Sequence, residues 1–383
     1  MDLWSRHQKI WSVLQILTRP WLPRKFGLES VQVEAEGPML LVSNHVCAWD
    51  PLLVAMSLRH KQVYYVASEH IFRLGLVSRL LNALVAPIPR RKAGSGADTV
   101  KAILRHLKAG HSVCLFAEGE QCWTGVNPPI FPATGKLART SGASLVTFRI
   151  EGGYLSLPRW SLHGVRRGRV RAHPVKVYSP EELKAMTPAE INAAITADIR
   201  EDAWERQRRE RIAYRGRRMA EGLERALYLC PSCKRFGTLR TENDRVQCDC
   251  GFETRWTETG FFDPPAPFAD LEQWDRWQRE ALGRGDYVRP ADPAAPLFSD
   301  GSFHLSRLGT DHEAVRLGEG PLLQYADRLV CAGREFPWAE ITNMALVQSH
   351  LLLLTDRQGD YYECRAMKPA NLRKYLELWK QRT

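Results

Sequence analysis

The strongest constraint on the fold is an alternation of apolar strands and helices between residues 30 and 180. Four short apolar runs have the pattern of strands buried on both faces: Met39–Ser43, Val63–Ala67, Val113–Ala117 and Leu145–Ile150. Helices are expected between them, including Pro51–His60 and Asp98–Ala109, the second of which stops at Gly110. This alternation predicts an α/β domain with a central mixed sheet flanked by helices.

The remainder of the chain is expected to form smaller parts. A capping box at Thr187–Glu190 opens a helical stretch that should run to about Leu229. We place a cysteine-rich unit at 227–260, a tryptophan-containing helix and linker at 261–300, and a β-rich domain with a final helix at 301–383. The β-like runs of this last domain are Phe303–Ser306, Leu322–Tyr325, Arg328–Cys331, Leu351–Thr355 and Tyr361–Arg365. In its order of elements, this domain resembles a pleckstrin-homology-like domain.

Composition limits the classes of partner and compartment. Apolar residues make up 44% of the 383 residues, which excludes a disordered chain. The net charge of +11 favours an anionic partner, either nucleic acid or an acidic membrane. No apolar run is long enough for a membrane span, and polar residues interrupt the N-terminus where a signal peptide would be apolar. We therefore expect a cytoplasmic protein whose nine cysteines are mostly reduced.

Residues 1–27 have the composition of an amphipathic interfacial helix. Apolar residues recur there at helical spacing: Leu3, Trp4, Ile10, Trp11, Leu14 and Leu17. Tryptophan favours the membrane interface, and the nearby Lys9, Arg19, Arg24 and Lys25 favour anionic lipid. A helix that packs its tryptophans into a core is the alternative. The interfacial interpretation predicts peripheral attachment to the inner face of a membrane.

His45 and Asp50 are the candidate catalytic pair. Both follow the buried strand Met39–Ser43, and sites in open α/β sheets form at the carboxyl ends of strands. Asp50 precedes Pro51, which suits a helix N-cap. A neutral histidine can take the proton of an attacking alcohol, and a carboxylate on its other ring nitrogen fixes the tautomer. A helix cap and a turn residue, or a covalent route through Cys47, are the alternatives.

Two more strand ends carry polar groups. Glu118 and Gly119 follow Val113–Ala117, and Arg90, Arg91 and Lys92 follow another apolar run. Arginine suits bidentate recognition of phosphate. Together with His45, these groups can hold a phosphorylated alcohol for acyl transfer.

This ordered set of motifs resembles the glycerolipid acyltransferase family, which includes 1-acylglycerol-3-phosphate acyltransferase. The matching residues are Asn44, His45 and Asp50 in the first motif, Arg90 in the second, Phe116–Gln121 in the third and Leu145–Ile150 in the fourth. The resemblance covers about residues 28 to 180 and implies an acyltransferase sandwich, which we place at 28–226. It also implies that His45 is the general base and that Asp50 orients it.

The resemblance further implies an acceptor site and an acyl donor. Asn44, Glu118 and Gly119 would belong to the acceptor site, and Arg90 would contact the acceptor's phosphate. The donor would be acyl-CoA or acyl-carrier protein, and the chemistry would use no cofactor. Gln121 stands where the family's third motif has arginine, and Phe148 stands where the fourth has proline. Arg91, Lys136 or Arg149 can supply the missing cation, or the acceptor lacks a terminal phosphate.

Four cysteines form a candidate metal site. Cys230 and Cys233 make one close pair and Cys248 and Cys250 another, with 14 residues between the pairs. Four thiolates in this pattern suit tetrahedral Zn²⁺ in a closed structural site, and iron is the alternative. The sequence therefore predicts a zinc ribbon at 227–260, which stabilises a part too small to fold alone.

The combined prediction is an O-acyltransferase that acts on a lysophospholipid at an anionic membrane surface. A second hypothesis is a nucleic-acid-binding protein that uses the ribbon and a run of arginines: Arg206, Arg208, Arg209, Arg211, Arg215, Arg217 and Arg218. The run has no aromatic stacking platform interleaved with its arginines, so nucleic acid is disfavoured. A third hypothesis is a lipid-binding relative of the acyltransferases without activity.

Overall fold

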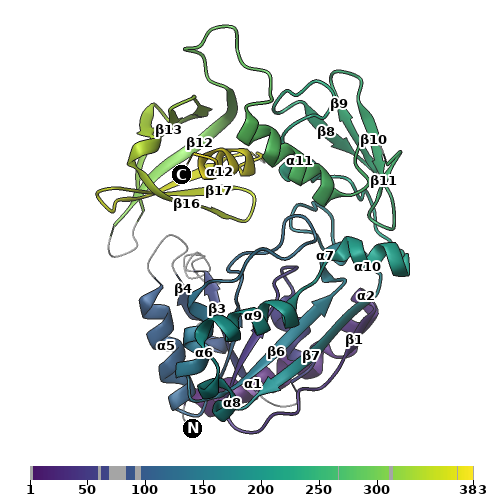
Figure 1. Cartoon of the computed structure of the whole chain (residues 1–383), viewed down its shortest axis with the longest axis vertical. Helices are drawn as coiled ribbons and strands as arrows, with labels where there is room; N and C mark the ends of the chain where they lie inside the picture. The colour runs from purple at the N-terminus through teal and green to yellow at the C-terminus, as the bar shows by residue number, and fades with distance from the viewer. Residues whose placement is uncertain are drawn as a thin grey trace. The chain divides into compact units, whose positions relative to one another are not determined.

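The computed structural model describes residues 3–58, 62–68, 83–90, 96–265, 267–309, 314–368 and 370–382. The chain forms two compact units (Figure 1). The first consists of Met1–Arg159, Gly164–Arg217 and Glu258–Gly260, and the second of Trp160–His163, Arg218–Thr257 and Phe261–Thr383. The predicted acyltransferase segment therefore corresponds mainly to the first unit, and the predicted ribbon, linker and β-rich domain mainly to the second.

A mixed sheet, with seven strands in the described residues, is the centre of the first unit. The order is β1-β7-β6-β2-β5-β3-β4, and only β6 and β7 pair antiparallel. The strands are β1 (Leu28–Ser30), β2 (Met39–Ser43), β3 (Val63–Ser68), β4 (Ile88–Arg90), β5 (Ser112–Phe116), β6 (Ser144–Glu151) and β7 (Val170–Tyr178). The four predicted apolar runs form β2, β3, β5 and β6, so the predicted α/β class with a mixed sheet is confirmed.

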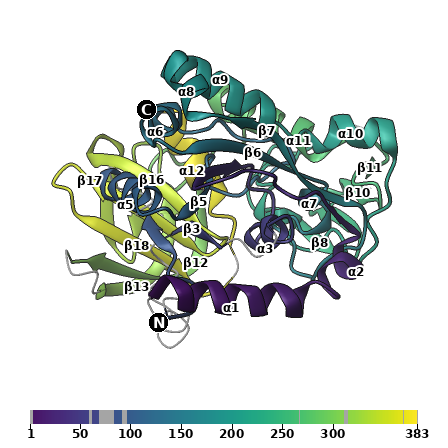
Figure 2. The ribbon, with the colours of Figure 1, turned by 90° about the horizontal axis from the view of Figure 1, so that it is seen from below.

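Helices cover both faces of this sheet. They are α1 (Leu3–Thr18), α2 (Leu22–Phe26), α3 (Asp50–Ala55), α5 (Ala97–Lys108), α6 (Ala133–Thr140), α7 (Gly153–Ser156), α8 (Pro180–Ala185), α9 (Pro188–Ile199) and α10 (Ala203–Glu210). On one face, Ile103 of α5 and Ile195 of α9 belong to the same buried cluster as Leu40 and Val42 of β2. Figure 2 shows α1 on the other side of the sheet from α8 and α9.

Two helix predictions differ from the structure. The helix predicted at Pro51–His60 begins at Asp50 and ends at Ala55, and residues 59–61 lie outside the described part of the chain. The single helical stretch predicted from Thr187 to Leu229 is wrong. Its capping box forms as predicted, but α9 ends at Ile199. A new helix, α10, then starts because the Asp202 side chain accepts hydrogen bonds from the backbone N–H groups of the next turn.

The N-terminal helix α1 buries two polar side chains, His7 and Gln15, and exposes several apolar ones. His7 is buried against the Tyr64 hydroxyl, and the buried Gln15 amide donates to the carbonyl oxygens of Ala55 and Leu58. Trp4 stacks on the His111 ring at 4.0 Å between centroids. Trp11 is also buried. The alternative in which these tryptophans pack inward is therefore correct for both of them.

Among the helices of the described residues, none combines the length and apolar character needed to cross a membrane.

The second unit contains two antiparallel sheets. The smaller has the order β11-β10-β9-β8, from β8 (Leu239–Glu242), β9 (Arg245–Cys248), β10 (Glu253–Trp256) and β11 (Phe262–Asp263). The larger has the order β15-β14-β13-β12-β18-β17-β16. Its strands are β12 (Phe298–Leu308), β13 (Ala314–Gln324), β14 (Arg328–Cys331), β15 (Arg334–Pro337), β16 (Ile341–Val347), β17 (Leu351–Asp356) and β18 (Tyr361–Ala366).

The described part of the second unit also contains two α-helices. They are α11 (Leu271–Arg284) and α12 (Arg373–Lys380), and the short 3₁₀ turns are Leu223–Arg225 and Trp338–Glu340. The Arg373 guanidinium donates to both oxygens of Asp275 at 2.5 and 2.7 Å, which joins α12 to α11 through a buried ion pair. Each of the five predicted β-like runs coincides with a strand, so the predicted β-rich region with a final helix is confirmed. The strands β15 and β16 were not predicted.

Candidate active site and metal centre

The sheet register brings the predicted motifs to one edge. In the parallel pair of β2 and β5, Ser43 lies opposite Phe116, so His45 and Glu118 each stand two residues beyond their strand. Arg90 is the last residue of β4 and pairs with Ser68 of β3, the next strand along this edge. Residues far apart in sequence therefore meet where the parallel strands end, as expected for sites in open α/β sheets.

His45 and Asp50 form a direct hydrogen bond. The Nδ1 atom of His45 lies 2.7 Å from Oδ2 of Asp50. Because an ionised carboxylate only accepts, Nδ1 carries the proton and Nε2 is left with its lone pair. The His45 side chain is 20% exposed and stacks on the Phe116 ring at 4.4 Å. The ring is thus fixed in orientation and in tautomer while it keeps access to solvent.

Asp50 is buried, and its side chain closes a tight turn by bonding the backbone of the residues just before it. It is 0% exposed, and its Oδ2 also accepts from the backbone N–H groups of Val46 at 2.6 Å and Cys47 at 3.0 Å. The prediction that Asp50 is the N-cap of its helix is wrong, because Trp49 is the N-cap and Asp50 is already helical. The carboxylate turns back toward the His45 loop because that loop offers it unpaired N–H donors.

Cys47 does not have the surroundings of a nucleophile. It is buried, and its Sγ donates to Oδ1 of Asp50 at 3.1 Å. Burial, followed by the Asp50 charge, raises the pKa of the Cys47 thiol well above its usual value. A reactive cysteine needs a thiolate. The covalent alternative through Cys47 is therefore disfavoured by its environment.

The Glu118 side chain fixes the His45 loop by a hydrogen bond to its backbone. Its Oε2 accepts from the backbone N–H of His45 at 3.1 Å, and its Oε1 accepts from the side-chain amide of Asn127. Burial raises the pKa of the Glu118 carboxyl well above its usual value, while these two hydrogen bonds oppose that rise. On its other side, the His45 carbonyl oxygen accepts from the N–H of Cys122 at 2.8 Å. The third motif, through Glu118, and the next residue, Cys122, thus bond the backbone N–H and C=O groups of His45.

Asn127 is a site residue that the sequence did not reveal. Its Nδ2 donates to Glu118, and its Oδ1 accepts from the backbone N–H of Glu201. That N–H fixes the orientation of the amide, so the donor must face Glu118. Nothing in the local sequence marks Asn127, because the backbone group that orients its amide, the N–H of Glu201, is 74 residues away.

Gly119 leaves room for the Arg90 guanidinium. Its φ is +72°, and a Cβ at this position would lie 2.4 Å from Nη1 of Arg90 and 2.2 Å from the Phe131 ring. The guanidinium of Arg90 stacks on that ring at 4.1 Å. Burial lowers the pKa of Arg90, and the Glu120 charge opposes this change. A glycine is therefore required here for the cation to reach its place.

The other predicted substrate-binding residues are in different positions. Asn44 is buried, and its amide exchanges two hydrogen bonds, of 2.9 and 2.8 Å, with the Ile150 backbone on β6. Lys136 lies on the exposed side of α6. Arg91 lies outside the described residues. Asn44 thereby joins the end of β2 to β6, and contact between any of these three and a substrate stays a prediction.

An arginine from another part of the chain, Arg159, lies next to Gln121, which stands where the third motif has arginine. The Nη1 atom of Arg159 lies 3.1 Å from both Oε2 of Glu120 and the Gln121 carbonyl oxygen. Its guanidinium stacks on Trp123 at 4.1 Å. By contrast, Arg149 donates to the Asp198 carbonyl oxygen and pairs with Glu151. Arg159 supports the loop in which Gln121 replaces the family's arginine.

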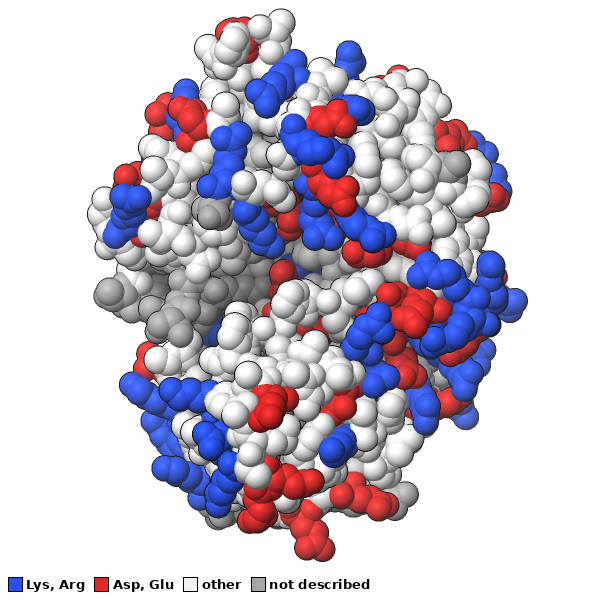
Figure 3. Space-filling view, in the orientation of Figure 1, with Lys and Arg blue, Asp and Glu red and all other residues white. Residues whose placement is uncertain are grey.

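The arginine run that suggested nucleic acid is largely paired with carboxylates. Arg206 is buried and bonds Glu201 at 3.1 Å, and Arg209 pairs with Glu205. Arg215 pairs with Glu258 of the same unit. At the right of Figure 3, basic and acidic side chains are interleaved over α10. This pattern is that of an ion-paired surface and disfavours a continuous track for phosphates.

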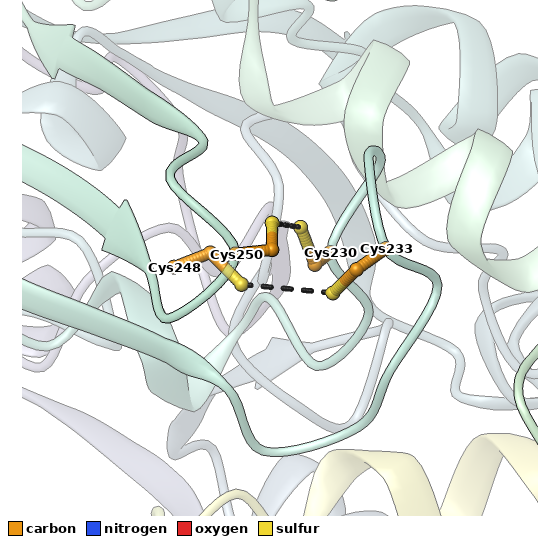
Figure 4. Close-up of side chains that lie close together, drawn as sticks. All are labelled: Cys230, Cys233, Cys248 and Cys250. Carbon is orange, nitrogen blue, oxygen red and sulfur yellow. Dashed lines mark hydrogen bonds between the residues drawn. The ribbon is translucent and has the colours of Figure 1, made fainter.

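The four cysteines come together at one point in the second unit. Their Sγ atoms all lie within 4.8 Å of one another, and the pairs Cys230–Cys250 and Cys233–Cys248 are each 3.7 Å apart. Figure 4 shows two pairs, from two loops, with their sulfur atoms turned toward a common centre. A hydrogen bond from the Phe252 N–H is the first cause that lowers the pKa of Cys250, to about 6. This cluster can hold a metal ion.

Comparison with known protein families gives a match within the first unit. Residues 25–151 match the family model described as Acyltransferase. This stretch, which matches the acyltransferase family, holds the His45 site.

One solved structure with a similar chain is the crystal structure of the 1-acyl-sn-glycerophosphate (LPA) acyltransferase PlsC from Thermotoga maritima. The match has 16% sequence identity and a TM-score of 0.41, and it covers 50% of this chain and 76% of that chain. Values this low support no argument about the substrate of this chain.

Proposed function

We propose that this protein transfers a fatty acyl group from acyl-CoA or acyl-carrier protein to the hydroxyl of a lysophospholipid. His45 is the general base in this proposal, and Asp50 orients it. The observation that carries the proposal is the 2.7 Å contact between Nδ1 of His45 and Asp50, inside a stretch that matches the acyltransferase family. The opposite nitrogen, Nε2, is then free to act on a substrate.

The reaction needs one proton to move twice. As the acceptor hydroxyl attacks the thioester carbonyl, Nε2 of His45 takes the hydroxyl proton. A new ester bond forms and the carbon–sulfur bond breaks. The buried Asp50 carboxylate stabilises the imidazolium in between, and the proton then passes to the departing thiolate. The chain's own residues therefore supply the base, its orientation and the return of the proton.

Arg90 is the proposed contact for an acceptor phosphate. It stands at the strand edge shared with His45, and in the described residues no carboxylate lies within ion-pair distance of its guanidinium. Arginine recognises phosphate by paired hydrogen bonds. Arg91 and Lys136 remain additional candidates. The preference for an acceptor with a terminal phosphate is part of the proposal.

The test of this function is the His45→Ala variant. We expect acyl transfer to a panel of lysophospholipids to fall by at least about a hundredfold, because a general base contributes about 10²–10⁴ to rate. His163→Ala is the matched control, since His163 also bonds a carboxylate, Glu221, at 2.6 Å but lies in the second unit. Wild-type activity in His45→Ala with unchanged folding by circular dichroism would overturn the mechanism.

We also propose that the exposed side of α1 and α2 attaches the enzyme to an anionic membrane. Ile16 and Leu17 are 60% and 66% exposed, and Val13 and Trp21 are exposed as well. Lys25 lies over the Trp21 ring at 4.3 Å, so positive charge borders this apolar side. Such a surface suits insertion at the level of the lipid headgroups. Vesicle co-sedimentation should weaken in Leu17→Glu and persist in Gln8→Glu, which makes the same charge change on an exposed polar residue of α1.

For the four cysteines, we propose structural Zn²⁺. A tetrahedral site with Zn–S bonds of about 2.3 Å requires sulfur atoms about 3.8 Å apart. Two of the Sγ pairs are 3.7 Å apart, and all of them lie within 4.8 Å. All four ligands come from the protein, which is typical of closed structural sites. In this proposal the metal stabilises the loops that precede β8 and follow β9.

A further inference from the structure

A hollow of about 420 Å³ lies in the second unit next to the loop of the cysteine cluster, and its lining contains none of the four cysteines. One side is formed by the turn after Cys233, from Arg235 to Thr238. The others are formed by residues 288–290, by the start of β12 and by Lys374 of α12. Four separate segments of the chain thus build this hollow, and neither the acyl-transfer proposal nor the zinc proposal uses it.

The hollow carries more positive than negative charge. Arg235 and Arg289 line it, both are exposed, and no carboxylate among the described residues forms an ion pair with either guanidinium. The third cation, Lys374, is buried and bonds Asp300 at 2.7 Å. That carboxylate also accepts from the Tyr375 hydroxyl at 2.6 Å, so Asp300 is occupied. Two arginines therefore remain available to an anion.

The remaining walls are apolar. Phe298 is buried against Phe236 at 4.6 Å between ring centroids, and both line the hollow with Val288 and Leu297. Val288 is 47% exposed. An apolar wall beside two free arginines suits a molecule with an anionic group joined to an apolar part. Arginine pairs best with phosphate or carboxylate, because its fork of N–H donors makes two parallel hydrogen bonds.

We propose that this hollow binds a phosphate group carried by a lipid, with Arg235 and Arg289 on the phosphate and Val288 and Leu297 beside the first apolar atoms. The site is separate from the His45 site and does not depend on acyl transfer. Its chemistry would also accept free phosphate, so the test must distinguish the two sources.

The experiment is calorimetric titration of the full chain with two probes. One is dihexanoyl phosphatidic acid below its critical micelle concentration, and the other is inorganic phosphate. The test variant is the double substitution Arg235→Gln and Arg289→Gln. The control is Arg255→Gln with Arg276→Gln, which removes the same charge from exposed positions of the same unit outside the hollow.

We expect the wild type and the control to bind the short-chain lipid alike, and the test variant to bind at least about tenfold more weakly. Inorganic phosphate should bind more weakly than the lipid in the wild type. Equal affinity for both probes, lost in the test variant, would assign the hollow to free phosphate and overturn the lipid part. Equal losses of affinity in both double variants would show that binding depends on net charge alone. Unchanged binding in the test variant would show that the lipid binds elsewhere, for example at the His45 site. Each of these two results overturns the proposal, and so does the absence of binding to the wild type.

Discussion

The His45 site and the four-cysteine cluster differ in what holds their reactive groups in place. Around His45, the polar groups that hold the imidazole ring and its loop have partners from the protein, while Nε2 of His45 faces the substrate side in the proposed mechanism. Asp50 accepts from His45, Val46 and Cys47, and Glu118 accepts from His45 and Asn127. In the cysteine cluster, the sulfur atoms contact one another and Thr238, and backbone N–H groups of the same loops, such as that of Phe252, donate to them.

This difference has a consequence for function. A site held by internal hydrogen bonds is positioned before any substrate arrives, so its geometry can be lost by a change of one atom. A cluster of thiols that meet at one point has geometry suited to an added ion, so its stability should depend on that ion. The first region is thus sensitive to small substitutions, and the second should be sensitive to metal.

The largest effect should come from Asp50→Asn. The amide keeps the volume of the carboxylate but loses the charge, and its –NH₂ group can face His45 and favour the wrong tautomer. In a serine hydrolase triad the same change costs about 10⁴ in rate, so we expect a loss of about 10³–10⁴ in kcat here. Steady-state assays with a lysophospholipid would measure it. A loss smaller than about tenfold would show that Asp50 does not orient the base.

A smaller effect, on stability rather than rate, should follow from Cys250→Ser. Cys250 is exposed, so the substitution leaves no cavity. We expect the bound zinc-to-protein ratio to fall from about one. The free energy of opening residues 228–256, measured by hydrogen exchange, should fall by about 3 kcal/mol or more.

The matched variant for this test is Cys250→His, which keeps a zinc ligand and should restore both values. Activity at the His45 site should change little in either variant. A protein that contains no zinc as purified, or a serine variant with unaltered exchange, would contradict the metal proposal.

The sequence predicted the parts of both regions that depend on local pattern. The run Met39–Ser43 is apolar up to its last residue and forms β2 with the same bounds, and the spacing of the cysteine pairs led directly to the cluster. Local pattern did not reveal which side of α1 is buried. Both sides carry apolar residues, and the buried side is decided by the hydrogen bonds that His7 and Gln15 make with distant residues.

Partners far apart in sequence could not be predicted either. The role of Asn127 depends on Glu118 and on the Glu201 backbone, and the latter is reached only after the chain has passed through β6, β7 and four helices, α6 to α9. The sequence showed that Gln121 stands where the family's motif has arginine, but it did not show that Arg159 lies next to Gln121. Residues that support a site from behind are determined by packing, while residues of the motif itself are visible in the sequence.

Asn127→Ala gives the smallest of these effects and tests the support behind the His45 loop. The variant removes one of the two donors to the buried Glu118 carboxylate, so the His45 backbone loses part of its anchor. We expect kcat to fall about tenfold, since misplacement by a fraction of an ångström is costly, while KM for the acyl donor stays nearly constant.

The matched control is Asn192→Ala. The Asn192 amide also bonds two backbone groups, Gly135 and Pro132, at 2.7 Å each, but it joins α9 to the start of α6 rather than to the His45 loop. Both variants should lower the melting temperature by a similar amount, and only Asn127→Ala should lower kcat. If the two variants lose activity equally, Asn127 contributes to stability alone, and the dense hydrogen bonding around His45 is not what sets the catalytic geometry.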